Sequence, residues 1–84
     1  MAQRRITSPG FRDRRYRKVI EHLKLRRLEL GLSQQALAER LGLHKQFVSR
    51  VELGERRLDF IELVDIARAL EIDPAMLVAA IPGE

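Results

Sequence analysis

The chain of 84 residues contains no cysteine and no tryptophan, and only 5% of its residues are aromatic. Without cysteine, neither a disulfide framework nor a thiolate metal site can form, and two histidines give little basis for a metal site. The chain has no apolar run near the ~18 residues that a membrane span requires, and no hydrophobic core of a secretory signal. We expect a soluble cytoplasmic protein with no membrane association, metal or cofactor.

Patterns typical of enzymes are also missing. The sequence has no Ser/His/Asp set at a meaningful spacing, no glycine loop that would cradle phosphates and no paired acids facing a cavity. It is too short to hold a separate ligand-sensing domain, so no small-molecule ligand is evident. We therefore do not expect an enzyme.

Strand patterns are absent, because β-branched and aromatic residues do not alternate with polar ones. Hydrophobic residues make up 45% of the chain, with many Leu, Ala, Glu and Arg, which favours helices. A chain of this length forms one domain and buries roughly 60% of its extended surface. The predicted fold is all-α, a compact bundle of about five short helices.

The net charge of +4 is unevenly distributed. Residues 1–18 carry a net charge of +6, residues 19–54 carry +2 and residues 55–84 carry −4. The N-terminal half therefore offers the surface that a polyanion would prefer.

Two short helices joined by a tight turn are predicted in the segment SQQALAERLGLHKQFVSRVELG. In the first, Leu37, Ala38 and Leu41 share one stripe, and the small Ala38 lets two steeply crossing helices approach. Gly42 supplies the positive φ of the turn, and Leu43 is expected to plug the corner. In the second helix, one side packs through Phe47, Val48 and Val51, and the other offers Lys45, Gln46, Ser49, Arg50 and Leu53.

This spacing resembles the helix-turn-helix of the phage-repressor-like DNA-binding proteins, the Cro/C1 or XRE family. The likeness extends over roughly residues 20–77, and the matching motif positions are Leu37, Ala38, Leu41, Gly42, Leu43, Val48 and Val51. The resemblance implies a lambda-repressor-like fold and a small bacterial or phage transcriptional regulator that binds double-stranded DNA. Phage repressors, restriction-modification controllers and antitoxins are not separated by this sequence.

A helix over residues 45–53 fits the major groove of B-DNA, which is about 12 Å wide. There Lys45 and Arg50 can donate to guanine, Gln46 can pair with adenine, and Ser49 can make a small contact. One such helix reads few base pairs, so a homodimer on half-sites ~34 Å apart is expected. The candidate contacts between copies, which could instead complete the core, are Met76, Leu77 and Ile81, with Leu25 as an additional candidate for the contact.

Four residues are candidate phosphate contacts. Gln34 begins a predicted helix at a position where the family commonly holds the DNA backbone with a Gln. His44 stands where the family usually has a Ser or Thr cap; imidazole caps poorly, so His44 could reach a phosphate or a base. Arg56 and Arg57 follow the second helix and could clamp the backbone. Contact with water alone is the alternative for Gln34, Arg56 and Arg57.

A first helix is predicted from Arg14 or Lys18 to Leu30, with Arg27 in the middle of its apolar face. A guanidinium there costs several kcal/mol unless a carboxylate meets it. We expect a structural ion pair with Glu52, as family members often have, although Arg27 could instead extend its head to water. The face consists of Val19, Ile20, Leu23 and Leu30.

Beyond the helix predicted over residues 45–53, Asp59 and Glu62 fit a capping box, and Asp73-Pro74 begins a fifth helix. Glu71 stands where the family typically has Gly, so a strained or altered turn is expected. The core positions predicted for the fourth helix are Phe60, Leu63, Val64, Ala67 and Leu70.

The predicted organisation is a flexible basic arm over residues 1–13 and a DNA-binding domain over residues 14–84. The arm could lie along phosphates or enter a minor groove, and a solvated tail is equally consistent with its composition. The net charge of −2 over residues 19–84 supports a second hypothesis, in which the same fold binds a protein, as an antitoxin binds its toxin.

Overall fold

The computed structural model describes residues 12–81, and within them the chain forms five helices and no strand. The helices are α1 (Arg14–Glu29), α2 (Gln34–Leu41), α3 (Lys45–Leu53), α4 (Phe60–Ala69) and α5 (Pro74–Ala79). The all-α prediction is confirmed. Most of the predicted arm lies outside the described residues, and no helix within them is long and apolar enough to cross a membrane.

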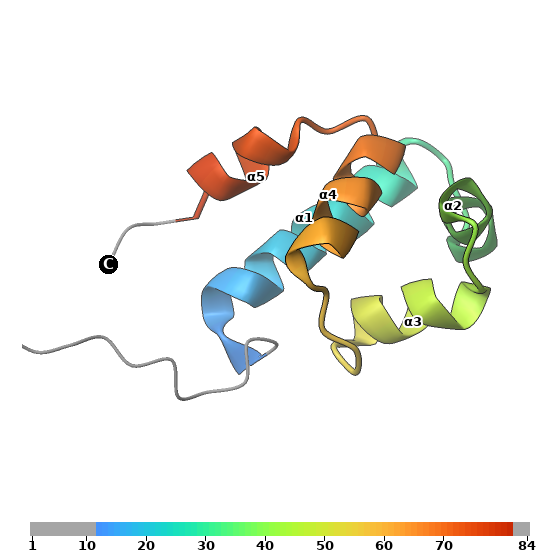
Figure 1. Ribbon diagram of the computed structural model, residues 1–84, viewed down its shortest axis with the longest axis horizontal. Helices are drawn as coiled ribbons and strands as arrows, with labels where there is room; N and C mark the ends of the chain where they lie inside the picture. The colour runs from blue at the N-terminus through green and yellow to red at the C-terminus, as the bar shows by residue number, and fades with distance from the viewer. Residues whose placement is uncertain (1–11, 82–84) are drawn as a thin grey trace, which may run out of the picture.

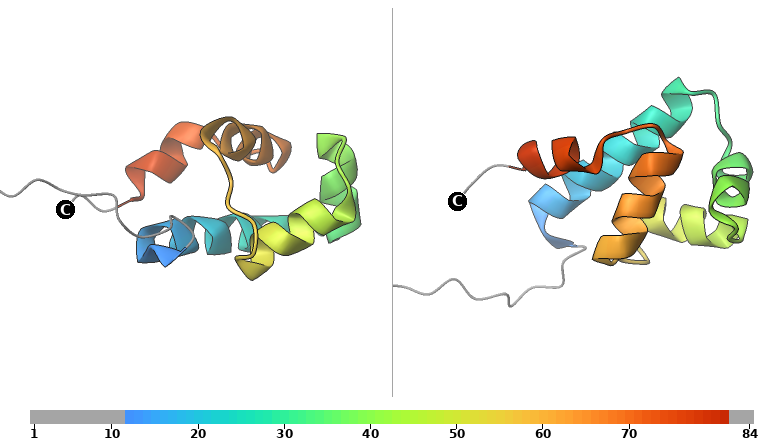
Figure 2. Two further views of the ribbon diagram at one scale, coloured as in Figure 1. Left: turned by 60° about the horizontal axis from the view of Figure 1, so that its bottom comes forward. Right: turned by 45° about the horizontal axis from the view of Figure 1, so that its top comes forward.

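The helices form two layers (Figures 1 and 2). In the left view of Figure 2, α1 and α3 lie along one side, α4 and α5 lie along the other, and α2 closes one end. Figure 1 shows α3 along the lower edge and α5 at the upper left. The side of α3 that faces away from α4 is therefore at the surface of the molecule.

Side-chain caps begin four of the five helices. Ser33 Oγ accepts from the N–H of Ala36 at the start of α2, and Asp59 forms the predicted capping box with Glu62 at α4. Asp73 caps α5, with Pro74 in its first turn, and Asp13 caps α1. Since each cap satisfies an otherwise unpaired N–H group, these residues fix where the helices begin.

One cluster of apolar side chains forms the core between the two layers. It contains most of the residues predicted for α1, α2 and α3, and the other three, Leu30, Leu41 and Phe47, are partly buried and pack against it. Two further members, Leu58 and Ile66, were not indicated by the sequence. The buried members are Val19, Ile20, Leu23, Leu37, Ala38, Val48, Val51, Leu58, Ile66, Ala67, Leu70 and Leu77.

The prediction that Phe60 belongs to the core is wrong, because 70% of its surface is exposed. The buried face of α4 is centred on Ala67, Leu70 and Ile66. At 3.6 residues per turn, Phe60 lies about 70° away from the centre of that face. Phe60 is also the first residue of the helix, so its side chain extends past the end of the core.

The prediction that Leu43 plugs the corner between α2 and α3 is also wrong, because 45% of its surface is exposed. Its backbone closes the turn instead, since its N–H donates to the carbonyl of Ala38 at 2.9 Å. That bond is part of the glycine-terminated helix end, and it does not depend on the side chain that follows the glycine. Leu43 lines a surface groove with Phe47.

Glu71 occupies the left-handed conformation after α4, with φ = +62°. The corresponding turns after α1, α2 and α3 are made by glycines. The N–H of Ile72 donates to the carbonyl of Ala67 at 2.8 Å, which closes the same turn. A residue with a Cβ at such a position costs about 1–2 kcal/mol, so the strain expected from the sequence is located at Glu71.

We predict that Glu71→Gly raises the free energy of unfolding by about 0.5–1 kcal/mol. Relief of the left-handed strain exceeds the entropy that glycine loses on folding. The exposed contact of Glu71 with Arg40, at 3.8 Å, contributes little. Urea unfolding measures the change. In the matched variant Gly42→Ala, nothing lies within 4 Å of the added Cβ, so its expected loss of ~1 kcal/mol isolates the backbone effect. An unchanged or lower stability of Glu71→Gly would contradict the prediction.

Candidate nucleic-acid interface

The unit formed by α2 and α3 depends on Gly42 and Ala38. Gly42 adopts φ = +70°, which ends α2, and α3 begins three residues later at Lys45. Ala38 is completely buried, and of all the helix pairs α2 and α3 are in the most extensive contact. The small side chain permits this approach, so α3 is held rigidly across the end of α2.

The two sides of α3 differ in burial as its sequence predicts. Val48 and Val51 are buried in the core, and Phe47 packs partly against it. On the other side, Lys45, Gln46 and Arg50 are exposed and Ser49 is half-buried. Three of the four side chains predicted to read bases therefore lie at the surface of the described part of the chain, and the fourth is partly covered.

Arg27 is buried, with 6% of its surface exposed, and it meets Glu52 from α3. Its Nε donates to Oε2 of Glu52 at 2.6 Å and its Nη2 donates to Oε1 at 3.0 Å. Its Nη1 donates to the carbonyl of Leu32 at 2.7 Å, in the loop before α2. The structure thus brings the two residues together in a bidentate pair that joins α1 to α3.

Gln34, the first residue of α2, joins this ion pair. Its Nε2 donates to Oε1 of Glu52 at 2.9 Å, and the residue is half-buried. The sequence did not indicate this bond, because it depends on how the start of α2 meets the end of α3. The candidate phosphate contact is therefore also part of the network that joins three helices.

His44 precedes α3 without a side-chain hydrogen bond to its backbone, and the residue is exposed. Its backbone is extended, as in an ordinary helix cap. An imidazole on the edge of the exposed face of α3 is therefore available to a ligand, which the cap residue of a typical helix would not be.

The loop after α3 places its two arginines differently. Arg56 makes a bidentate ion pair with Glu62, donating from Nη1 at 2.9 Å and from Nη2 at 2.7 Å, and its guanidinium lies 4.8 Å from the ring centre of Phe47. Arg57 is exposed. Arg56 therefore stabilises the loop, and Arg57 is the arginine with its charge at the surface.

Tyr16 also holds this loop. Its hydroxyl accepts from the N–H of Leu58 at 3.0 Å, which fixes the chain between α3 and α4 against α1. Tyr16 is the single tyrosine of the chain, and it packs against the core. Sequence analysis missed this role, because nothing in the local pattern links a tyrosine to a backbone group 42 positions away.

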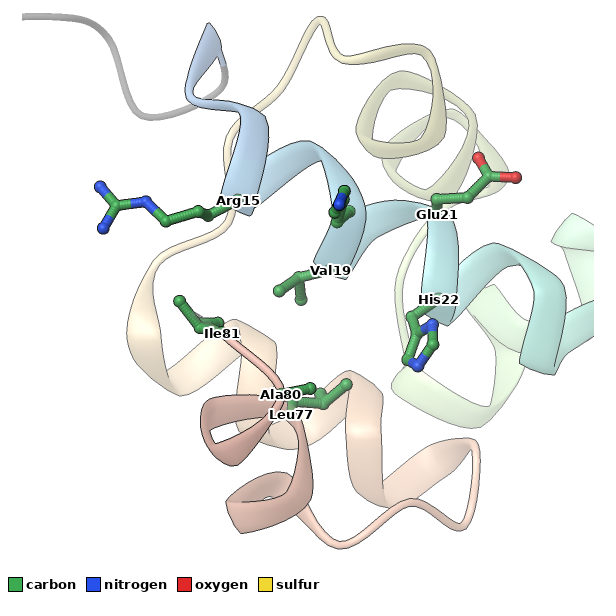
Figure 3. A pocket seen from close by; sticks show the side chains of 8 residues that line it. Arg15, Val19, Glu21, His22, Leu77, Ala80 and Ile81 are labelled. Carbon is green, nitrogen blue, oxygen red and sulfur yellow. The ribbon is translucent and has the colours of Figure 1, made fainter. Parts of the chain in front are cut away.

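A groove of about 250 Å³ separates the start of α1 from α5 (Figure 3). Val19, Leu77 and Ile81 face it, whereas Arg15 extends away from it. Leu77 is only 3% exposed and belongs to the core of its own chain, which is one of the two alternatives that the sequence left open for it. Met76 and Ile81 are exposed, at 67% and 37%. Among residues 12–81, no group of three or more acidic or histidine side chains could hold a metal ion.

The arrangement of α2 and α3 defines a helix-turn-helix, and a helix-turn-helix family model matches residues 23–77. The chain is similar to a solved XRE-family like protein from Pseudomonas syringae pv. tomato str. DC3000. The identity is 40% and the TM-score is 0.76, over 80% of this chain and 82% of that one.

Two further solved structures are similar. The restriction-modification controller protein C.AhdI from Aeromonas hydrophila is 33% identical, with a TM-score of 0.70 over 83% of this chain and 99% of that one. The hypothetical transcription factor NHTF from Neisseria is 27% identical, with a TM-score of 0.69 over 89% and 85%. No curated protein matches. The chain belongs to the XRE family of helix-turn-helix proteins and is a DNA-binding transcription regulator of that type.

The ion pair in the loop predicts a stability effect at acid pH. Hydrogen bonds from Arg56, and from the backbone N–H of Asp59, lower the pKa of Glu62. A carboxylate whose pKa is lowered on folding adds stability above its unfolded pKa, and this stability is lost as the pH falls through the folded value. We predict that Glu62→Gln loses less stability than the parent between pH 5 and about pH 3.

Urea unfolding at each pH measures this difference. Glu55→Gln removes the same charge from an exposed neighbour in the loop and should keep the acid dependence of the parent. If Glu62→Gln and the parent lose stability in parallel, the ion pair does not contribute as described.

Proposed function

We propose that this chain is a cytoplasmic, sequence-specific regulator of transcription, a repressor or controller, that inserts α3 into the major groove of double-stranded DNA. One observation carries the proposal. The buried side of α3 is locked into the core, while Lys45, Gln46 and Arg50 on its other side are exposed without partners among the described residues. Rigid presentation of hydrogen-bonding side chains is what reading base edges requires.

Each exposed side chain has a role in this proposal. Lys45 and Arg50 donate to guanine O6 and N7, and Gln46 makes a bidentate pair with adenine. Ser49 is half-buried and makes a short contact close to the helix. Each good bidentate pair is worth ~1–3 kcal/mol of discrimination against the wrong base.

Phosphate contacts flank these residues. Gln34 holds one strand at the start of α2, where the helix dipole favours an anion. Arg57 and His44 contact the backbone at the two ends of α3. Arg56 remains in its ion pair with Glu62 and supports the loop that carries Arg57, so in this proposal Arg57 alone makes the phosphate contact of the loop.

Base reading is tested by replacing Lys45, Gln46 and Arg50 together with alanine. We expect loss of binding to DNA selected in vitro, while circular dichroism and thermal unfolding remain those of the parent. The control Lys24→Ala/Arg68→Ala also removes two positive charges, one from α1 and one from α4, and should retain specific binding. Specific binding by the triple variant would contradict the roles of these side chains.

The alternative is a protein-interaction module of the same fold, such as an antitoxin, and the net charge of −2 over residues 19–84 favours it. It predicts a parent protein that selects no DNA sequence. A DNA-binding protein should instead show affinity that falls with salt, with a log–log slope near −0.9 for each phosphate contacted. In vitro selection followed by a salt titration of the parent separates the two functions.

We further propose that two copies bind neighbouring half-sites about one helical turn, ~34 Å, apart. One α3 reads too few base pairs to find a site in a genome, so a second copy adds the missing specificity. Met76 on α5 and Ile81 just after it are the proposed contacts, with Leu25 on α1 as a further candidate, since all three are exposed apolar residues.

The contact surface is tested with Met76→Lys/Ile81→Lys. Burying two charges at the proposed interface should convert a dimer into a monomer in sedimentation velocity and weaken binding to paired half-sites. Phe60→Lys, at an apolar residue with similar exposure on α4, should leave the dimer intact. A dimeric double variant would place the interface elsewhere, and a parent that stays monomeric on paired half-sites would contradict dimerisation.

A further inference from the structure

Glu52 accepts three hydrogen bonds from two helices. Arg27 on α1 supplies two of them, and Gln34 at the start of α2 supplies the third, from Nε2 to Oε1 at 2.9 Å. The side chains of the ion pair are each less than a tenth exposed. No buried side-chain polar atom in residues 12–81 lacks a partner, so this network is complete within the protein.

We propose that Glu52 is a positioning residue for DNA binding. It orients the carboxamide of Gln34 in the free protein, so that the first turn of α2 is already arranged to bind one backbone phosphate of the DNA. Arg27 makes this possible by neutralising the carboxylate. The inference rests on the DNA-binding function proposed above and extends it, because it gives the ion pair a role in affinity in addition to its role in the fold.

The chemistry of the three groups fixes the orientation of Gln34. A carboxylate accepts hydrogen bonds and donates none, so the amide must turn its nitrogen, and not its oxygen, toward Glu52. That nitrogen carries a second N–H, and phosphate oxygens likewise only accept. Without Glu52, the side chain would be ordered only on binding and would lose its rotamer freedom at that step.

Charge explains why Arg27 is needed. An unpaired carboxylate within hydrogen-bond distance of Gln34 would repel the phosphate that Gln34 binds. The bidentate guanidinium cancels this charge, and its third bond, to the carbonyl of Leu32, holds the loop from which α2 begins. The position of the start of α2 relative to α3, and so of the phosphate contact relative to the base contacts, depends on this network.

A double-mutant cycle tests the inference. Gln34→Ala is made in the parent and in Arg27→Met/Glu52→Leu, which replaces the ion pair with apolar side chains of similar size. We expect Gln34→Ala to weaken DNA binding about tenfold in the parent, the effect of one hydrogen bond to a charged group. The apolar pair should weaken it by a similar factor, and adding Gln34→Ala to that pair should change little more.

Two readouts separate positioning from a purely structural role. Urea unfolding should show the apolar pair to be folded. Gln34→Ala in the parent should lower the affinity for specific and non-specific DNA by the same factor, because phosphates carry no sequence information. The matched control Gln35→Ala, at the exposed neighbour that bonds Glu39 at 3.1 Å, should have a small effect that is equal in both backgrounds.

The inference is overturned if Gln34→Ala costs the same factor in both backgrounds, or if the folded apolar pair binds DNA like the parent. If the variant with the apolar pair fails to fold, nitrogen relaxation of the side-chain amides in the free parent tests the inference instead. The Gln34 amide should be more ordered than that of Gln35, and equal mobility would refute positioning. A parent that binds no duplex refutes the proposed function itself and removes this inference with it.

Discussion

The buried ion pair between Arg27 and Glu52 is the interaction on which the arrangement of the first three helices depends. Removing two charges from water costs several kcal/mol for each, and attraction between the charges compensates only when every remaining donor is satisfied. Here the guanidinium also bonds the Leu32 carbonyl, and the carboxylate also bonds Gln34. An error in the packing of α1, α2 or α3 would leave a buried charge unpaired, so the pair selects one geometry.

That geometry determines which side of α3 remains for a ligand. Gly42 and Ala38 allow α2 to cross α3 closely, and the valines of α3 face the core. With one side fixed by packing, the other side cannot rotate inward without exposing those valines. Rigid presentation of Lys45 and Arg50 is thus a consequence of core packing, and it requires no contribution from the exposed residues themselves.

Much of the fold and of the candidate site could be predicted from local sequence patterns. Helix caps, the glycine turn and the buried arginine follow from spacing and from the cost of burying charge, because these effects act within one helix or at its ends. Phe60 and Leu43, which were wrongly predicted to be buried, lie at helix ends, where periodicity does not determine how far the core extends. Contacts of Arg56, Tyr16 and Gln34 with distant partners depend on tertiary packing, which a single sequence does not contain.

Tertiary packing also determines which charges of the protein lie at its surface. In sequence, α3 carries a net charge of +1, from Lys45 and Arg50 against Glu52. In the fold, Glu52 is turned inward and neutralised by Arg27, so the exposed side of α3 keeps both positive charges and no acid. α4, which carries Glu62 and Asp65, lies in the opposite layer (Figure 2). Because exposed charges interact over about 8–10 Å at ordinary salt, the local surface governs approach to DNA, and the net negative charge of residues 19–84 is weak evidence against it.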